Sequence, residues 1–255
     1  MRALIIPSPG QLQLSDLPMP EIGPYESLVR IECCGICSST DWKLIRGQMP
    51  WAPAFPIILG HESVGTVEET GKRVKNFKTG NRVTRVVFPP TAEMNAAFGG
   101  FAEYGVVVDA KAMAEDGNPS LLNDYVASRQ LVVPTTLSVV EASLAISLSE
   151  TASVFNDLPT MRNRRLLVAG TGVAGLALTL WAKFSRAHVT CLGRRESRLE
   201  LAEQLGADVA VNTTEPEWKE QVLSQGGPVD GVIEAIGNPS LARELETLVQ
   251  PNGFL

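Results

Sequence analysis

The sequence lacks several features that would place it in a large class of proteins. No stretch reaches the roughly eighteen uninterrupted apolar residues that suggest a membrane-spanning helix. No Lys/Arg-rich segment is present and the formal net charge is −6, so we expect no nucleic-acid partner, because the phosphate backbone has to be met by a basic face. The N-terminus carries one arginine and a short apolar run broken by Pro7, which is a poor match to a secretory signal peptide.

Cysteine and histidine are scarce as well. The chain has four cysteines and two histidines, and three of the cysteines lie between residues 33 and 37. Cysteines crowded in this way make a poor disulfide framework for a chain of 255 residues. We therefore expect a reducing, cytoplasmic location and no association with a membrane.

The composition that remains is that of a globular protein, with 44% hydrophobic and 20% charged residues, and the length favours two domains. In the first half, short runs alternate between apolar and polar residues, as in ESLVRIEC at 26–33, and glycines separate them. Short strands joined by glycine turns predict a small β barrel or sandwich.

The second half has a different pattern. A helical segment without Gly or Pro at 138–158 is followed by apolar runs that alternate with amphipathic stretches. This alternation predicts a parallel sheet with helical crossovers. We therefore expect an α/β protein with two domains, at residues 1–149 and 150–255.

A glycine-rich turn stands at the start of the second domain. The segment LLVAGTGVAGLAL places Gly170, Gly172 and Gly175 in the G-x-G-x-x-G spacing, between a predicted strand and a predicted helix. The first glycine permits a tight turn, the second lets the backbone approach a pyrophosphate, and the third lets the helix pack on the strand, while the helix N-terminus offers N–H groups to the phosphates. We predict a dinucleotide site here, including Val173 and Ala174. The alternative is a turn that serves only helix–strand packing.

The end of the next predicted strand indicates which dinucleotide binds. A site for NAD has Asp or Glu at this position to hold the ribose 2′-hydroxyl, whereas this sequence has Gly193 followed by Arg194 and Arg195, with Arg198 nearby. A carboxylate would repel a 2′-phosphate, and a guanidinium binds one well. The sequence therefore favours NADP over NAD. The alternative is that these arginines only form the solvated start of a helix.

Residue types that bind metals occur in the first domain. Cys37 and His61 are zinc ligand types far enough apart to lie on two loops of one cleft, and Glu62 adds a carboxylate. Two other interpretations remain open from the residues alone: a hydrogen-bonded surface histidine, and a redox pair formed by Cys34 and Cys37.

Several short motifs of the sequence occur together in a known family. GICSSTD, ILGHESVGTV, GKRVKNFKTGNRV and GGFAEY, followed by the glycine turn, resemble in the same order the zinc-dependent medium-chain dehydrogenase/reductase family, which contains alcohol, polyol and glucose dehydrogenases. The resemblance covers essentially the whole chain. It implies an N-terminal GroES-like β domain that carries a catalytic zinc, a doubly wound Rossmann domain that carries a nicotinamide cofactor, and a reaction in the cleft between them.

The resemblance also implies roles for individual residues. Cys37 and His61 match two zinc ligands, and Glu62 matches a glutamate that stands beside the metal and can enter or leave its coordination shell. The third ligand of the family lies on the segment leading into the Rossmann domain, where we assign Glu150. The alternative is that Glu150 is an exposed helix carboxylate, since the same region also contains the acids Glu141 and Asp157.

The family carries a proton away from the site through a hydroxyl two residues after the cysteine. That position is Ser39 here, but CSSTD is one residue longer than the usual C-x-[ST]-D, so Thr40 is a competing candidate. Asp41 is then a supporting residue of the site or a turn acid.

Two departures from the family limit the expectation. Four closely spaced cysteines that bind a structural zinc in some members are missing before GGFAEY, so we expect one catalytic zinc and no structural zinc. The chain ends at PNGFL, inside the fifth predicted Rossmann strand, so we expect the sixth strand and part of the substrate pocket to be absent. We therefore interpret the chain as C-terminally truncated and expect doubtful activity in this form.

The sequence thus predicts a zinc-dependent oxidoreductase that transfers hydride between NADP(H) and an alcohol, polyol or sugar. Its expected partners are that small-molecule substrate and, for the longer protein, a second copy of itself. The alternatives are a zinc-free quinone or enoyl reductase of the same superfamily and a non-catalytic NADP-binding protein.

Overall fold

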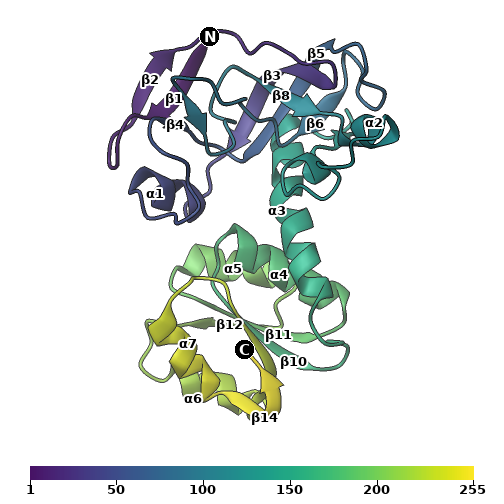
Figure 1. The fold of residues 1–255 in the computed structure, drawn as a ribbon. Coiled ribbons are helices and arrows are strands. Elements are labelled where there is room, and N and C mark those ends of the chain that lie inside the picture. The colour runs from purple at the N-terminus through teal and green to yellow at the C-terminus, as the bar shows by residue number, and fades with distance from the viewer. The chain divides into compact units, whose positions relative to one another are not determined.

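The computed structural model describes all 255 residues and divides into two compact units, Met1–Ile146 and Ser147–Leu255 (Figure 1). The division falls inside helix α3 (Val139–Asn156), near the boundary that the sequence predicts after residue 149.

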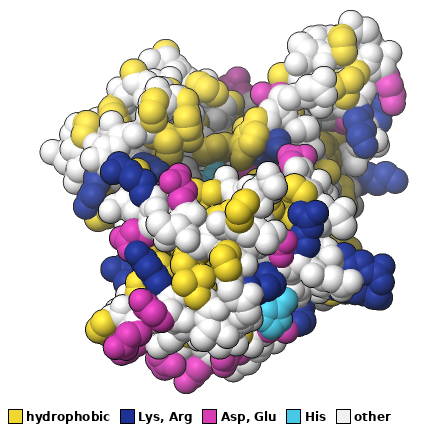
Figure 2. Space-filling model, turned by 90° about the horizontal axis from the view of Figure 1, so that it is seen from below, with side chains coloured by type: hydrophobic (Ala, Val, Ile, Leu, Met, Phe, Trp, Pro, Cys, Tyr) yellow, Lys and Arg dark blue, Asp and Glu magenta, His cyan; other side chains and the backbone are white.

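None of the helices combines the length and hydropathy that crossing a bilayer requires. On the face that Figure 2 shows, Lys and Arg side chains are interspersed with Asp and Glu and do not gather in a stripe.

The first unit is built on two sheets. The larger has the strand order β8-β3-β5-β6-β9 and is antiparallel throughout, and the smaller has the order β2-β1-β4-β7. The larger sheet consists of β3 (Glu26–Gly35), β5 (Glu62–Thr70), β6 (Arg82–Thr84), β8 (Tyr104–Val108) and β9 (Val132–Val133). The smaller consists of β1 (Arg2–Ile6), β2 (Gln13–Asp16), β4 (Ile57–Ile58) and β7 (Asn95–Ala96). Three short helices lie in the segments between these strands: α1 (Thr40–Ile45), α2 (Ala110–Glu115) and the 3₁₀ helix Ala127–Arg129.

Alternating side chains of the larger sheet form one of the hydrophobic clusters of this unit. Val29 of β3 packs with Val67, Val83 and Val107 from the neighbouring strands, whereas Arg30 points to solvent. Strand β6 is shorter than the alternating segment NRVTRVVF at 81–88 predicts. It ends at Thr84 because Arg85 takes a left-handed backbone conformation with φ of 54°, which a strand does not accommodate.

The second unit contains one parallel sheet with the order β12-β11-β10-β13-β14. Its strands are β10 (Arg165–Ala169), β11 (His188–Gly193), β12 (Val209–Asn212), β13 (Val229–Glu234) and β14 (Val249–Phe254). Its helices are α4 (Val173–Phe184), α5 (Glu196–Gln204), α6 (Trp218–Ser224) and α7 (Pro239–Glu246). This order confirms the predicted doubly wound parallel sheet.

Helices cover both faces of that sheet (Figure 1). One face carries a cluster with Leu178 and Ala182 of α4 against Leu166 and Val168 of β10. The opposite face carries the cluster that α6 and α7 form with the strands, through residues such as Trp218, Val222 and Leu245. Side chains of β10 therefore alternate between two buried faces, which is why RLLVA is a continuous apolar run.

Candidate metal and dinucleotide sites

The pairing of β3 with β5 brings the predicted metal ligands together. In this antiparallel ladder Gly35, the last residue of β3, lies opposite Glu62, the first residue of β5. Cys37 follows the end of β3 and His61 precedes β5, so the ladder fixes both beside Glu62. One ligand atom from each of Cys37, His61 and Glu62 lies within 4.8 Å of the other two.

Asp41 supports this cluster from helix α1. Asp41 is 3% exposed, its Oδ2 accepts a hydrogen bond from the backbone N–H of Cys37 at 2.9 Å, and its Oδ1 lies 3.6 Å from Nδ1 of His61. The extra residue of CSSTD is therefore accommodated without losing the acid: helix α1 starts at Thr40 and turns Asp41 inward. Asp41 is a buried partner of the site and not a solvent-exposed turn acid.

The electrostatics of the cluster depend on these contacts. Burial would lower the pKa of His61, but the neighbouring Asp41 carboxylate and Cys37 sulfur outweigh it and raise the pKa to about 9. Burial would raise the pKa of Cys37, but hydrogen bonds from His61 and from Thr40 outweigh it and hold that pKa below its usual value. The lowered pKa brings the Cys37 thiol closer to the thiolate form that a metal requires.

The donor set fits a zinc ion. A thiolate, an imidazole and a carboxylate are the ligand types that catalytic zinc takes. In addition, Nδ1 of His61 and Oδ1 of Asp41 are buried atoms without a hydrogen-bond partner. These two atoms face each other at 3.6 Å, so Asp41 orients the imidazole through Nδ1 and leaves Nε2 as the nitrogen available to a metal.

Cys34 does not behave as the second half of a redox pair. Burial raises the pKa of its thiol far above the usual value, and its sulfur contacts the carbonyl of Gly35. A reactive disulfide partner needs thiolate character, which this environment suppresses. Cys33 also lies in β3, and all four cysteines are free.

Ser39 and Thr40 differ in their positions. Ser39 is exposed and stands at the N-cap of α1, where its side chain makes no capping hydrogen bond. Thr40 is half-buried, and its backbone N–H donates to Sγ of Cys37 at 3.5 Å. Of the two candidates, Thr40 is therefore the more buried residue and contacts the Cys37 sulfur through its backbone.

Phe98 is a residue of the site that the sequence did not single out. Its ring centroid lies 5.2 Å from that of His61 and 5.8 Å from that of Trp51, and its backbone φ is 84°. A positive φ is unusual for a bulky residue. The only sequence signal is its position directly before the two glycines of GGFAEY.

Glu150 lies in helix α3, within the second unit, and is partly buried. Of the other acids in this region, Glu141 is committed elsewhere: its carboxylate accepts from the N–H of Ser138 at 2.7 Å while its own N–H donates to the Ser138 hydroxyl at 3.2 Å. This reciprocal pair is a capping box at the start of α3. Asp157 is exposed beyond the helix end. The assignment of Glu150 as a ligand stays a prediction.

The glycine turn has the geometry that each of its glycines predicts. Gly170 has a φ of 125°, and a Cβ on Gly175 would collide with the carbonyl oxygen of Gly170, so helix α4 packs directly on the turn. A Cβ on Gly172, in contrast, would meet no atom within 4 Å. Gly172 is the N-cap of α4, so open space lies before the N-terminus of the helix that begins with Val173 and Ala174. A helix N-terminus that is open in this way is the kind of place where a pyrophosphate binds in dinucleotide-binding folds.

The end of β11 presents the predicted basic residues. Gly193 is buried, Arg194 and Arg195 are exposed, and Arg198 is partly exposed in the first turn of α5. No acidic side chain occupies the strand end itself. Three cationic side chains near one strand end are a suitable setting for a phosphate group.

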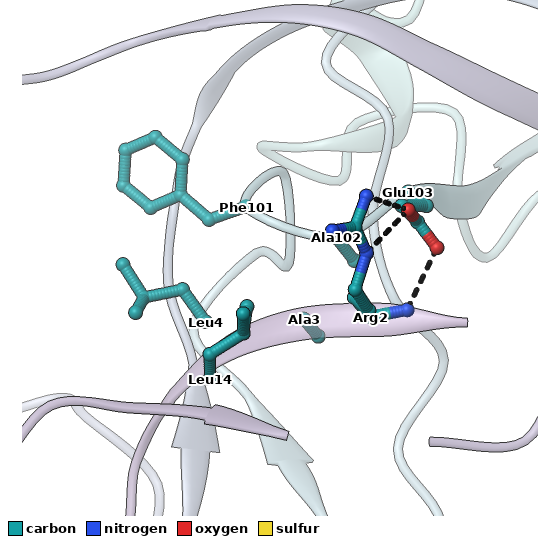
Figure 3. A pocket seen from close by; sticks show the side chains of 7 residues that line it. All are labelled: Arg2, Ala3, Leu4, Leu14, Phe101, Ala102 and Glu103. Carbon is teal, nitrogen blue, oxygen red and sulfur yellow. Dashed lines mark hydrogen bonds and ion pairs between the residues drawn. The ribbon is translucent and has the colours of Figure 1, made fainter. Parts of the chain in front are cut away.

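A separate pocket of about 300 Å³ lies on the first unit, away from these residues (Figure 3). Leu4, Leu14 and Phe101 form its apolar side. On the other side Nε and Nη2 of Arg2 donate to Oε1 of Glu103 at 2.9 and 2.7 Å. None of the predicted metal or cofactor residues lines this pocket.

Two family models match the chain, the alcohol dehydrogenase GroES-like domain at residues 23–115 and the zinc-binding dehydrogenase at residues 173–255. The chain belongs to the zinc-dependent medium-chain dehydrogenase/reductase family. This confirms the predicted family and its two-domain fold class.

Curated members of the family are similar along most of the chain. An alcohol dehydrogenase of Cupriavidus necator is 27% identical over 293 residues, covering 100% of this chain and 75% of that protein. A sorbitol dehydrogenase of Macaca fascicularis is 29% identical over 236 residues, covering 91% of this chain and 64% of that protein. The family matched here is thus one of oxidoreductases that act on alcohols or polyols.

Solved structures of the family give the same fold with either cofactor. A zinc-binding dehydrogenase from Sinorhizobium meliloti 1021 bound to NADP has a TM-score of 0.80 and 25% identity, covering 99% of this chain and 74% of its own. An alcohol dehydrogenase from E. coli CFT073 complexed with NADH has a TM-score of 0.77 and 25% identity, with the same coverage. Similarity alone therefore does not select between NADP and NAD.

Proposed function

We propose that this chain carries the zinc and NADP sites of a dehydrogenase that transfers hydride between NADP(H) and an alcohol, polyol or sugar. The observation that carries the proposal is the cluster of Cys37, His61 and Glu62, whose ligand atoms lie within 4.8 Å of one another. The membership in a family of alcohol and polyol dehydrogenases supports the reaction class.

In this proposal Cys37 and His61 hold the zinc, Glu62 stands beside it, and Glu150 completes the ligand set. Zinc supplies a Lewis acid that polarises the oxygen of the alcohol or carbonyl group. The buried Asp41 orients the His61 imidazole and fixes the Cys37 backbone through its hydrogen bond.

The proton released from the alcohol needs a route away from the reacting oxygen. We assign this step to the hydroxyl of Thr40, because Thr40 is half-buried and contacts Cys37, whereas Ser39 is exposed. A hydroxyl both accepts and donates a hydrogen bond, so it passes a proton on without becoming charged.

The cofactor assignment depends on the turn and on the strand end. Gly172 leaves open space before the N-terminus of α4, which suits the pyrophosphate. Arg194 and Arg195 are exposed and directly follow Gly193 at the end of β11, which supports binding of the 2′-phosphate of NADP. The bound cofactor supplies or accepts the hydride.

Metal analysis of the purified protein tests the zinc site. We expect about one zinc per chain for a catalytic site, and its loss in Cys37→Ser. Cys33→Ser is the matched control, because Cys33 is a partly buried cysteine of β3 outside the cluster. Glu150→Ala should lower zinc retention as well. Protein that binds NADP but no zinc would contradict the proposal.

Reduction of NADP⁺ across a panel of alcohols, polyols and aldoses, with and without a chelator, tests the reaction. Turnover that the chelator abolishes is expected with at least one of these substrates. No turnover with any of them by protein that holds both zinc and NADP would eliminate the dehydrogenase function.

A further inference from the structure

The strand end at Gly193 contains a steric feature that the glycine motif does not explain. A Cβ added to Gly193 would lie 2.7 Å from Cγ2 and 2.9 Å from Oγ1 of Thr171, and 3.0 Å from Cδ2 of Leu199. Carbon atoms without a bond between them do not approach so closely in a well-packed interior, since the attractive optimum is about 3.5–4.0 Å. The Thr171 side chain therefore fills the space beside Gly193.

Thr171 has little freedom to give way. It is 7% exposed, and it stands between Gly170 and Gly172 in the glycine turn. The N–H of Gly170 donates to the carbonyl of Leu192 at 2.9 Å, so the turn is tied to β11 one residue before Gly193. A β-branched side chain is also stiff about χ1.

Gly193 is held from its other side. Its carbonyl accepts from the N–H of Thr213 at 2.8 Å, and it pairs with Asn212 in the sheet. Neither the strand end nor the glycine turn shifts without breaking one of these hydrogen bonds. By contrast, the Leu199 contact involves the far end of a longer side chain that rotates more easily.

We propose that Thr171 is a specificity-determining residue that keeps position 193 closed to the acidic side chain required for NAD. This inference rests on the proposed NADP site. The position where an acid would hold the ribose 2′-hydroxyl is Gly193, and the residue that excludes a side chain there belongs to the glycine turn. Cofactor preference is thus set by two positions together, and a change at Gly193 alone is not enough to reverse it.

The test compares two double variants that differ only in the shape of residue 171. Thr171→Ala removes both atoms that face Gly193, whereas Thr171→Val keeps the branched shape and replaces the hydroxyl with a methyl group. Each is combined with Gly193→Asp, and the dissociation constants of NADH and NADPH are measured by fluorescence titration of the purified protein. Thermal unfolding of each variant without cofactor is measured in parallel.

We expect G193D alone and T171V/G193D to unfold at lower temperature than wild type and to bind both cofactors weakly. T171A/G193D should regain most of the lost melting temperature and bind NADH at least about tenfold more tightly than T171V/G193D does, because the space for the acid is then open. The proposal is overturned if G193D alone binds NADH as tightly as T171A/G193D and melts at the wild-type temperature.

A smaller substitution covers the case in which G193D does not fold. Gly193→Ala adds only the Cβ that the structure places against Thr171, so G193A should lower the melting temperature in the wild-type background and much less in the T171A background. Equal losses in the two backgrounds would refute the steric role of Thr171.

Wild-type protein separates this inference from the proposed function. If wild type binds NADH as tightly as NADPH, the proposed NADP preference is wrong, whatever the melting temperatures of the Gly193 variants show. If wild type prefers NADPH but the two double variants behave alike, the NADP site stands and the role of Thr171 is wrong.

Discussion

At the scale of single residues, the candidate metal site combines ligands that the sequence reveals with supports that it does not. Cys37 and His61 were predicted from their residue types and from the sequence motifs of the family. The importance of Asp41, in contrast, depends on its burial and on two contacts that only the folded chain creates. The sequence left Asp41 open between a supporting acid and a turn acid because CSSTD has one additional residue. Helix α1 starts at Thr40 and buries Asp41, which identifies Asp41 as the supporting acid.

Asp41→Asn should weaken zinc binding without unfolding the protein. The amide keeps the size of the side chain and can still accept from the N–H of Cys37, but it removes the negative charge that faces His61. Loss of such a supporting carboxylate costs roughly ten- to a hundredfold in metal affinity. Competition with a chromogenic chelator measures the change, and Asp157→Asn, which alters an exposed acid, is the control. An unchanged affinity in Asp41→Asn would show that Asp41 does not support the metal.

Thr40→Val and Ser39→Ala should separate the two candidate hydroxyls. Thr40→Val preserves the shape of the side chain and removes its hydroxyl, so kcat should fall by about a hundredfold while zinc content stays at the wild-type level. Ser39→Ala should change kcat little, since Ser39 is exposed. The two variants are compared by steady-state kinetics over a pH series. A larger loss in Ser39→Ala would reverse the assignment.

At the scale of secondary-structure elements, Asp109 joins two segments of the first unit. It is buried at the N-cap of α2, its Oδ1 accepts from the N–H of Ala112 at 3.0 Å, and its Oδ2 accepts from the N–H groups of Lys75 and Asn76 at 2.8 Å each. Burial alone would raise the pKa of Asp109, but these backbone hydrogen bonds outweigh it and hold the pKa below the usual value.

Asp109→Asn should destabilise the protein by about 2 kcal/mol at neutral pH, because an amide nitrogen then faces backbone N–H donors. A carboxyl whose pKa is lowered by folding contributes stability above its unfolded pKa of about 4, and that contribution is lost as the pH falls through the folded pKa. Urea unfolding at a series of pH values should therefore show a difference between wild type and Asp109→Asn that shrinks below about pH 4. Asp16→Asn, at an exposed position, is the control. A difference that is constant with pH would contradict this role of the Asp109 charge.

Elements with a clear periodicity were predictable, and those that depend on a few contacts were not. The parallel sheet followed from apolar runs such as RLLVA, which are buried on both faces. Helix α1 was not predicted, since six residues carry little periodicity and its first turn is fixed by the Cys37–Asp41 contact. The end of β6 at Thr84 depends on the left-handed conformation of Arg85, for which the sequence VTRVV gives no signal.

At the scale of the whole molecule, the charge of the chain and the charge of its proposed cofactor have the same sign. The net charge is −6 at pH 7, and NADP is an anion, so general electrostatics oppose binding. This repulsion is spread over the molecule and is largely screened at 0.1 M salt, where the Debye length is about 10 Å. The attraction between Arg194 or Arg195 and a 2′-phosphate acts at contact distance, so it persists at that salt concentration and weakens only as salt rises further.

The salt dependence of cofactor binding therefore reports on the arginines. We expect the dissociation constant of NADPH to rise more steeply than that of NADH between about 0.1 and 1 M salt, because the Debye length falls to about 3 Å and only NADPH carries the 2′-phosphate. In the Arg194→Gln/Arg195→Gln variant the two salt dependences should become parallel, since the contacts to the pyrophosphate at α4 are common to both cofactors. Fluorescence titration over a salt series measures these dissociation constants, with Arg243→Gln in the last turn of α7 as the control for the loss of one positive charge outside this arginine cluster. Parallel dependences in the wild type would mean that neither Arg194 nor Arg195 holds the 2′-phosphate, and the basis for choosing NADP would be lost.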